Sequence, residues 1–250
     1  MTRSPSWTTG WWRERLLEGL FPSTCGVCGA PVGAGGAVCA GCLADLPRVA
    51  APCPRCGEPE TAADLCARCQ RHAPRLDRLH APWRYAWPLD CLILARKHAD
   101  DATAARVLRE LARRAAGEMT DAMADPQPGV PPGPDCVVPV PLHPERYRER
   151  GFNQALELAQ EVARRLQAPL APRLVVRVRA TESQQGLGRR ERHRNVARAF
   201  ALRPGAELPE AAYVLLVDDV ATTGATLDAL AEVLYAAGAL RVEALTLARA

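Results

Sequence analysis

The sequence predicts an α/β domain with a mostly parallel β-sheet, preceded by a small cysteine-rich module. Two observations lead to this prediction. From residue 136 onward, apolar segments of strand length alternate with amphipathic helical patterns, as in parallel sheets whose crossovers are helices. Between residues 25 and 69, eight of the ten cysteines are arranged in pairs. The composition fits a folded chain, because 48% of the 250 residues are hydrophobic, which excludes a disordered protein.

No segment is predicted to cross a membrane. A transmembrane helix needs a run of about 18 or more apolar residues, and the sequence has none. The stretch from Trp7 to Phe21 has some features of a signal peptide, but Glu14 and Glu18 interrupt it and no small-residue cleavage site follows. We therefore expect a cytoplasmic protein without membrane insertion.

Arginine dominates the basic residues. Lys97 is the single lysine among 32 basic residues, and the formal net charge is +4. An arginine excess accompanied by many alanines and prolines is also produced by coding bias, so the net charge alone does not predict a nucleic-acid partner.

Four C-x-x-C pairs indicate a metal site. Such a turn presents two sulfur atoms on one side of a tight knuckle, and zinc requires four thiolates that converge tetrahedrally. Disulfides are disfavoured by the absence of an export signal. We predict structural zinc and no catalytic role for these cysteines, with an iron–sulfur cluster as the alternative. The paired cysteines are Cys25, Cys28, Cys39, Cys42, Cys53, Cys56, Cys66 and Cys69.

An internal repeat indicates how the pairs combine. One unit opens with C-G-V-C-G-A-P and closes with C-A-G-C, and the next opens with C-P-R-C-G-E-P and closes with C-A-R-C. The repeat predicts two tandem zinc ribbons, formed by the first four and the last four of these cysteines. Interleaved pairing is the alternative. The isolated Cys91 and Cys136 lie in apolar contexts and are expected in the core.

The periodicity divides the chain into three expected parts. These are an amphipathic helix within residues 1–21, the double zinc ribbon over residues 22–75 and the α/β domain over residues 76–250. The last part opens with a strand-like segment at 79–87, a helical pattern at 89–116 and a Pro/Gly-rich linker at 125–134. Strands are then expected at 136–140, 173–178, 213–217 and 240–247, and helices at 153–166 and 226–237.

The most informative segment begins within the strand expected at 213–217 and reads V-L-L-V-D-D-V-A-T-T-G-A-T-L. Asp218 and Asp219 end the strand, and a threonine-rich turn containing Gly224 leads into a helix. N–H groups at a helix start, with the positive end of the helix dipole, favour an anion. The carboxylates suit a diol or a Mg²⁺ ion. The segment therefore predicts a site for ribose 5-phosphate, and the alternative is an ordinary capped turn.

This segment resembles the 5-phosphoribosyl 1-pyrophosphate (PRPP) signature of type I phosphoribosyltransferases. The resemblance implies that Asp218 and Asp219 hold the ribose hydroxyls and that the loop after them binds the 5-phosphate. The residues implied for the loop are Ala221, Thr222, Thr223, Gly224, Ala225 and Thr226.

Two other segments, P-V-P-L-H-P-E-R-Y-R-E-R-G-F-N-Q and S-Q-Q-G-L-G-R-R-E-R-H-R-N-V-A-R-A-F, resemble motifs of the ComF/GntX family. That family also carries an N-terminal double zinc ribbon and an aromatic and basic stretch like residues 83–97. The resemblance covers about residues 20–248. It implies a type I phosphoribosyltransferase fold, two structural Zn²⁺, PRPP with Mg²⁺ as ligands and an association with competence and DNA uptake.

Charge is segregated along the α/β domain. Residues 143–203 contain 14 arginines against 6 acidic residues, whereas residues 204–250 contain 2 against 7. Arginine binds a pyrophosphate bidentately, so Arg146, Arg150 and Arg192 are the candidates for catalysis through the leaving group. Solvated arginines, or arginines paired with neighbouring glutamates, are the alternative. The polar segment at 181–195 is a candidate lid.

Two functions are compatible with the sequence. The first is a Mg²⁺-dependent phosphoribosyltransferase with an unknown acceptor. No general base is evident, since His143 and His193 are expected to be structural or surface residues. The second is a non-catalytic accessory factor of natural transformation that binds single-stranded DNA. Its contacts would come from the ribbons, the arginines and the aromatic residues at 83, 85 and 87, and competence and DNA-processing proteins would be its partners.

Overall fold

The computed structural model describes residues 23–33, 35–62, 64–123, 133–178 and 199–250. By its contacts the chain divides into two units, Met1–Asp45 and Leu46–Ala250. The first four paired cysteines fall in the first unit, and the last four fall in the second unit with the α/β body. The expected double-ribbon module over residues 22–75 therefore spans this division. The expected helix within residues 1–21 and most of the expected linker lie outside the described residues.

The first unit is a knuckle followed by a short helix. Thr24 and Pro31 form an antiparallel bridge, and Gly29 takes a φ of 75° in the turn between them, a conformation that glycine adopts without steric cost. Helix α2 (Ala40–Ala44) begins directly after Cys39. Cysteines therefore stand both in the turn and at the helix start.

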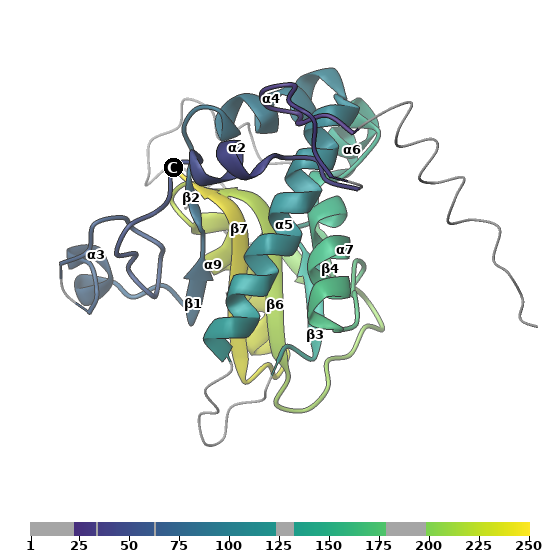
Figure 1. Cartoon of the computed structure of the whole chain (residues 1–250). Coiled ribbons are helices and arrows are strands. Elements are labelled where there is room, and N and C mark those ends of the chain that lie inside the picture. The colour runs from purple at the N-terminus through teal and green to yellow at the C-terminus, as the bar shows by residue number, and fades with distance from the viewer. Residues whose placement is uncertain (1–22, 34, 63, 124–132, 179–198) are drawn as a thin grey trace, which may run out of the picture. The chain divides into compact units, whose positions relative to one another are not determined.

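The second unit is built on a five-stranded parallel sheet, as predicted (Figure 1). Its strand order is β1-β7-β6-β3, and β2 also pairs with β7. The strands are β1 (Arg78–His80), β2 (Trp83–Arg84), β3 (Cys136–Pro139), β6 (Tyr213–Ala221) and β7 (Arg241–Arg249). A separate antiparallel pair is formed by β4 (Val175–Arg177) and β5 (Phe200–Leu202).

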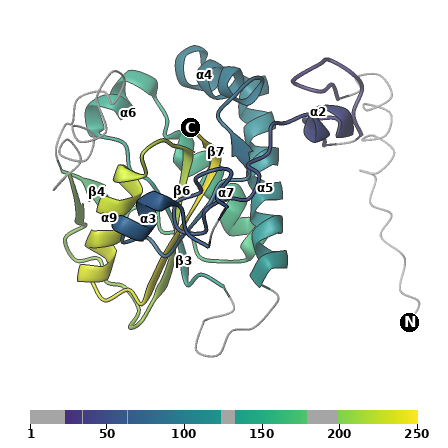
Figure 2. The ribbon, with the colours of Figure 1, turned by 90° about the vertical axis from the view of Figure 1, so that its left-hand side faces the viewer.

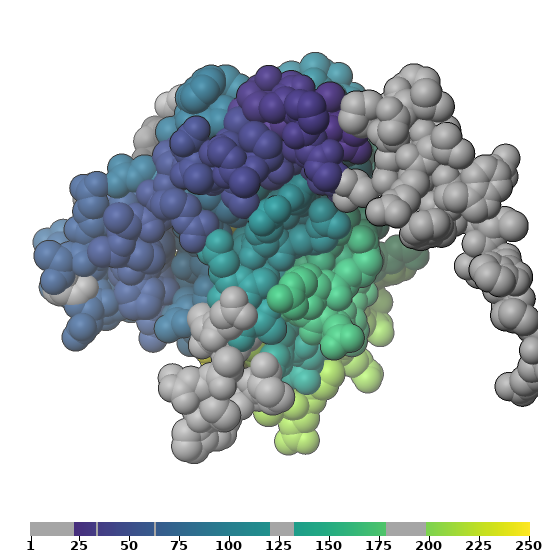
Figure 3. All heavy atoms as spheres, in the orientation of Figure 1, coloured from purple at the N-terminus to yellow at the C-terminus, as the bar shows by residue number. Residues whose placement is uncertain are grey.

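Helices cover both faces of this sheet (Figures 1 and 2). Helices α5 (Ala102–Met123) and α7 (Gln154–Leu166) pack side by side on one face, and α9 (Ala225–Ala236) lies on the other. The space-filling view shows α5 and α7 as the outer surface on their side (Figure 3). Burial on two faces explains the continuous apolar strand in the sequence, since a half-exposed strand would alternate polar and apolar residues.

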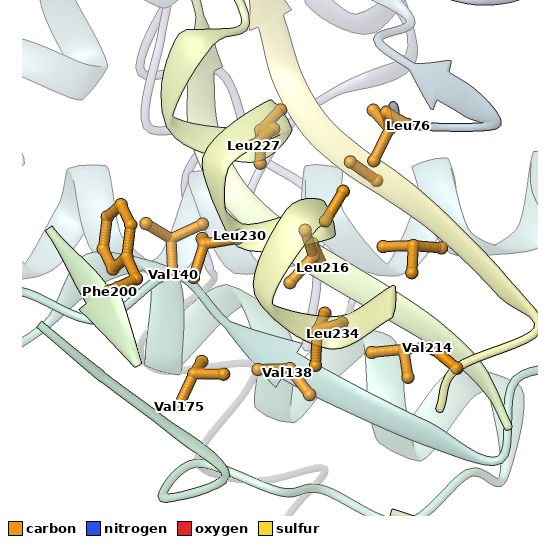
Figure 4. Close-up of a cluster of buried hydrophobic side chains, with 14 of the residues drawn as sticks. Leu76, Val138, Val140, Val175, Phe200, Val214, Leu216, Leu227, Leu230 and Leu234 are labelled. Atoms are coloured by element: carbon orange, nitrogen blue, oxygen red, sulfur yellow. The ribbon is translucent and has the colours of Figure 1, made fainter. Parts of the chain in front are cut away.

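The core between α9 and the sheet is formed by aliphatic side chains (Figure 4). Leu227, Leu230 and Leu234 of α9 are each at most 2% exposed. They pack in one cluster with Val214 and Leu216 of the central strand. Burying a leucine side chain contributes about 2–3 kcal/mol, so this layer holds the start of α9 firmly against the carboxyl end of β6.

The prediction of one helix over residues 89–116 is wrong, because this region contains two helices. Helix α4 (Leu89–Ala99) ends at Asp100, which has a left-handed φ of 49°. Asp101 then starts α5, since its carboxylate accepts hydrogen bonds from the N–H groups of Thr103 and Ala104 at 2.7 and 2.9 Å. Consecutive aspartates therefore end one helix and cap the next.

Other predictions need correction in detail. The strand-like segment at 79–87 is two short strands, and a helix that the sequence did not predict, α6 (Pro144–Arg150), follows β3. Cys136 is buried as expected, whereas Cys91 is exposed because it lies on the solvent side of α4. No helix in the described part of the chain combines the length and the apolarity needed to cross a bilayer.

Candidate functional site

The cysteines form two separate four-sulfur clusters. In each cluster the sulfur atoms lie within 4.8 Å of one another, and the clusters contain the first four and the last four paired cysteines, which confirms the tandem arrangement. The Sγ atoms of Cys28 and Cys39 are 3.7 Å apart, and those of Cys56 and Cys66 are 3.6 Å apart. A tetrahedron with Zn–S bonds of about 2.3 Å has edges of about 3.8 Å. The residues therefore fit structural zinc.

Backbone N–H groups support the sulfur atoms. The N–H of Cys39 donates to Cys25 Sγ at 3.3 Å, and the N–H of Cys66 donates to Cys53 Sγ at 3.5 Å. Hydrogen bonds of this kind stabilise thiolates. Four protein ligands complete the coordination of zinc, so neither site offers an open position for catalysis.

A second kind of site lies at the carboxyl end of the central strand. Strand β6 is longer than predicted and includes both Asp218 and Asp219. Asp218 accepts a hydrogen bond from the N–H of Asp219 at 2.9 Å. Burial and the adjacent Asp219 carboxylate raise the pKa of Asp218 to about 7. The pair therefore holds less than its full negative charge at neutral pH when no metal ion is bound.

Lys97 of α4 reaches this acidic pair. Its Nζ lies 2.6 Å from Asp219 Oδ2, with side chains that are 22% and 10% exposed. Burial lowers the pKa of Lys97, but the attraction of Asp219 and Asp218 outweighs it and raises that pKa overall. The single lysine of the chain is thus held charged beside the carboxylates.

The turn after the pair is held by arginines through its carbonyl groups. Arg249 Nη1 donates to the carbonyl oxygen of Ala221 at 3.2 Å and to that of Thr222. Arg68 Nη1 donates to the carbonyl oxygen of Thr223 at 3.1 Å. Three successive carbonyl groups therefore point toward guanidinium groups.

The N–H groups of the same turn consequently point the other way, because C=O and the following N–H are opposed in a planar trans peptide. These are the N–H groups of Thr222, Thr223 and Gly224, and they have no hydrogen-bond partner within the described part of the chain. Gly224 has a φ of 78° and precedes α9, so the helix start adds its partial positive charge. The turn presents several unused donors to an anion.

A cavity of about 840 Å³ lies over the acidic pair and the turn. Its lining includes Arg146 and Arg150 of α6, which the sequence predicted, together with Lys97, Tyr85 and Arg177, which it did not. Burial lowers the pKa of Arg177. Cations from three different elements therefore face the same space as the carboxylates.

The start of α7 forms another wall of the cavity. Asn153 caps the helix through its Oδ1, which accepts from the Ala155 N–H at 3.1 Å, and its Nδ2 donates to the Val140 carbonyl at 3.1 Å. Gln154 Oε1 accepts from Arg150 Nη1 at 3.1 Å, whereas the buried Gln154 Nε2 has no partner among the described residues. A donor without an acceptor thus lines the cavity.

Several predicted residues lie elsewhere or outside the described residues. Arg192, His193 and the candidate lid at 181–195 fall in a segment that the structure does not describe. Trp83 is 1% exposed and packs in the core, so its predicted contact with DNA is wrong. His143 caps α6 by accepting from the Glu145 N–H at 3.3 Å, in agreement with a structural role.

Two family models match parts of the chain. Residues 16–70 match the double zinc ribbon domain, and residues 153–250 match the phosphoribosyl transferase domain. The purine phosphoribosyltransferase of Pyrococcus horikoshii Ot3 is 15% identical, covers 56% of this chain and 82% of its own, and superposes with a TM-score of 0.33.

Full-length relatives identify the family. The chain is 34% identical over 91% of its length to the DNA utilization protein YhgH of Escherichia coli K12, of which 97% is covered. It is 33% identical over 85% of its length to the competence protein F of Haemophilus influenzae, of which 90% is covered. The chain belongs to the ComF family and combines a double zinc ribbon with a phosphoribosyltransferase domain.

Proposed function

We propose that the chain binds PRPP together with Mg²⁺ and transfers the phosphoribosyl group to an acceptor. The observation that carries this proposal is the turn after β6, in which unpartnered N–H groups of Thr222, Thr223 and Gly224 stand next to two carboxylates. N–H groups bind the 5-phosphate, and carboxylates accept hydrogen bonds from the ribose 2- and 3-hydroxyls. Few ligands other than a phosphorylated sugar require both.

The remaining cations suit the pyrophosphate of PRPP. Arg146 and Arg150 line the cavity from α6, and their partners are weak or neutral: Glu149 at 3.4 Å and the amide of Gln154 at 3.1 Å. Both guanidinium groups are therefore available for a phosphate oxygen, which forms stronger, charge-assisted hydrogen bonds. Gln154 Nε2 provides a further donor.

The acidic pair also fits a divalent cation. Mg²⁺ is bound through carboxylates and substrate oxygens, and Asp218 and Asp219 are the residues that would hold it. When bound, the ion supplies positive charge to the departing pyrophosphate. Binding of the ion at Asp219 would require Lys97 to move, since its Nζ lies 2.6 Å from Oδ2 of that carboxylate.

In the transfer step an acceptor nitrogen forms a bond to C1 of the ribose while the C1–oxygen bond to pyrophosphate breaks. Positive charge develops on the ribose, and the electron pair leaves with the pyrophosphate. The arginines stabilise the negative charge on the departing pyrophosphate, the acceptor nitrogen releases its proton to water, and the phosphate turn holds the sugar in line. A nitrogen nucleophile such as a nucleobase or amine is the expected acceptor class.

Release of pyrophosphate tests the transfer. A panel of nucleobases and amines is offered as acceptors with PRPP and Mg²⁺, and pyrophosphate is measured by a coupled assay. We expect Mg²⁺-dependent release with at least one acceptor, lost in Asp218→Asn/Asp219→Asn and kept in Glu232→Gln, which changes an exposed carboxylate of α9. Binding of PRPP without release for the whole panel contradicts the transferase activity but not the binding site.

Binding of single-stranded DNA is a second candidate, favoured by the names of the relatives and by exposed aromatic residues among arginines. Trp87 is 73% exposed and Tyr147 of α6 is 49% exposed, and Tyr147 stands between Arg146 and Arg148. Aromatic stacking contributes about 1–3 kcal/mol per base, and phosphate contacts make the affinity salt-dependent. Trp87→Ala and Tyr147→Ala should weaken oligonucleotide binding in a fluorescence anisotropy titration. Unchanged affinity in both variants, or no binding by the wild type, contradicts this candidate.

A further inference from the structure

The phosphate turn has open space on both of its sides. One side is the cavity of about 840 Å³ described above. On the other is a second cavity of about 650 Å³, whose lining includes Arg68 of the second ribbon, Leu76, Leu79 and Leu227. Gly224 lines both cavities, and a Cβ built on it would meet no atom within 4 Å. Packing of side chains therefore does little to fix the middle of the turn, although Ala221 and Ala225 at its ends are buried.

Two arginines fix the turn instead. Arg68 and Arg249 together bind the three successive carbonyl groups of residues 221–223. The direction of those carbonyl groups determines the direction of the N–H groups that follow them. The donors offered to phosphate thus depend on residues that do not themselves face the phosphate.

The same two arginines also contact the second ribbon, and both interact with Cys56, one of its predicted zinc ligands. Burial lowers the pKa of Arg68, but attraction to the Cys56 side chain outweighs burial and raises that pKa overall, so these two groups lie close together. Arg249 Nε donates to the Cys56 carbonyl oxygen at 3.1 Å, and Arg249 Nη2 lies 2.7 Å from Glu58 Oε2. Helix α3 (Ala67–Arg71), which carries Arg68, also carries the zinc ligand Cys69. The helix that carries Arg68 therefore also contributes a sulfur atom to the second four-sulfur cluster.

We propose that Arg68 and Arg249 are positioning residues that couple zinc in the second ribbon to PRPP binding at the turn. This inference rests on the proposed PRPP site. Loss of zinc frees Cys56 and α3, releases Arg68 from the Thr223 carbonyl and lets the N–H groups turn away from the phosphate. Coupling of two equilibria is reciprocal. Bound PRPP accordingly raises the zinc affinity of the second ribbon.

Arg68 is the better residue to substitute, because it is only half-buried. Arg249 is 6% exposed, so its substitution would destabilise the fold. Arg71→Ala is the matched control, since it removes an exposed arginine from the same helix. Arg68→Lys keeps the charge but offers a single ammonium group in place of a guanidinium that reaches both Cys56 and Thr223. It should restore part of the effect.

The experiment measures two affinities in each variant. PRPP affinity is measured by calorimetry with Mg²⁺, and zinc affinity is measured by equilibrium competition with a colorimetric chelator, with and without saturating PRPP. In the wild type and in Arg71→Ala, PRPP should raise the chelator concentration needed to remove one of two zinc ions. In Arg68→Ala, PRPP should bind about tenfold more weakly and should no longer affect either zinc ion, while both ions remain bound without chelator.

The outcomes separate this inference from the proposed function. A wild type that binds PRPP without any change in zinc affinity overturns the coupling alone. Arg68→Ala with wild-type PRPP affinity also overturns it. A wild type that binds no PRPP overturns the proposed function and the coupling together. Circular dichroism of Arg68→Ala distinguishes a local loss of affinity from unfolding.

Discussion

Lys97 Nζ lies 2.6 Å from Asp219 Oδ2, which joins helix α4 to the carboxyl end of the central strand. Two adjacent carboxylates at the end of a buried strand repel each other, and the ammonium group offsets part of that repulsion. In the proposed site the Lys97 ammonium group neutralises part of the negative charge of the acidic pair until Mg²⁺ and PRPP bind. This relationship determines how the acidic pair responds to pH.

Removal of Lys97 should make the acidic pair harder to ionise. An opposite charge within about 4–6 Å lowers a carboxyl pKa by about 1–3 units. Lys97→Met should therefore move the pH midpoint of PRPP–Mg²⁺ binding upward by about one unit, as measured by calorimetry from pH 5.5 to 9. Leu94→Met, which changes an exposed residue of α4 that does not line the cavity, serves as the control. A midpoint that is the same in Lys97→Met and in the wild type contradicts this role.

Binding of Mg²⁺ and PRPP should release a proton from the wild type near neutral pH. The pKa of Asp218 is raised to about 7 by burial and by Asp219, and a cation lowers that pKa on binding. Affinity should thus rise with pH up to about 8 and fall below pH 7. Calorimetry in buffers of different ionisation enthalpy measures the released proton directly. No dependence of the observed heat on the buffer at pH 7 contradicts the prediction.

Gln154 should contribute to the pyrophosphate end of the site. Its buried Nε2 has no partner among the described residues, and a hydrogen bond to a charged oxygen contributes about 1.5–3 kcal/mol. Gln154→Leu should weaken PRPP by about tenfold or more while leaving ribose 5-phosphate, which lacks the pyrophosphate, nearly unaffected. Equal losses for both ligands indicate instead that the substitution disturbs the whole cavity.

Glu243 should stabilise the fold above pH 4.5. Burial raises its pKa, but hydrogen bonds from His80, Arg241 and Tyr213 outweigh burial and lower it to about 2. A depressed carboxyl pKa means that the stabilisation is complete above the unfolded value of 4.5 and is lost as the pH falls toward 2. The difference corresponds to about 3 kcal/mol. Urea titrations at pH 7 and pH 3 should show about 2 kcal/mol of this loss in the wild type, because pH 3 still lies above the folded pKa.

The matched comparison uses two glutamates. Glu243→Gln should lower the free energy of unfolding at pH 7 and flatten its dependence on pH between about 4.5 and 2. Glu210→Gln, which changes an exposed carboxylate, should do neither. Equal pH profiles for Glu243→Gln and the wild type contradict the assignment of acid sensitivity to Glu243.

The features that the sequence predicts well are those formed by consecutive residues. The tandem zinc clusters follow from the internal repeat of the cysteine pairs, and the turn after Asp219 follows from one continuous segment. The parallel sheet follows from apolar strands separated by helices. Local patterns suffice here because the ligand atoms come from neighbouring positions.

The remaining parts of the site depend on tertiary contacts. Three side chains reach the cavity from distant elements: Lys97 from α4, Tyr85 from the segment after β2, and Arg177 from β4. No spacing in the sequence links them to Asp219. One signal was present, since a single lysine in an arginine-rich chain is unusual. The hydrogen bonds from Arg68 and Arg249 to the turn span about 150 and 30 residues of sequence. Only the packed structure brings these groups together.

Both proposals depend on binding of PRPP by the turn after β6 and the acidic pair. The decisive experiment is a calorimetric titration of PRPP in the presence and absence of Mg²⁺, in the wild type and in Asp218→Asn/Asp219→Asn. We expect one PRPP per chain, Mg²⁺-dependent affinity in the wild type and loss of that dependence in the double variant. No heat of binding in the wild type with Mg²⁺, or an unchanged affinity in the double variant, would contradict the claim.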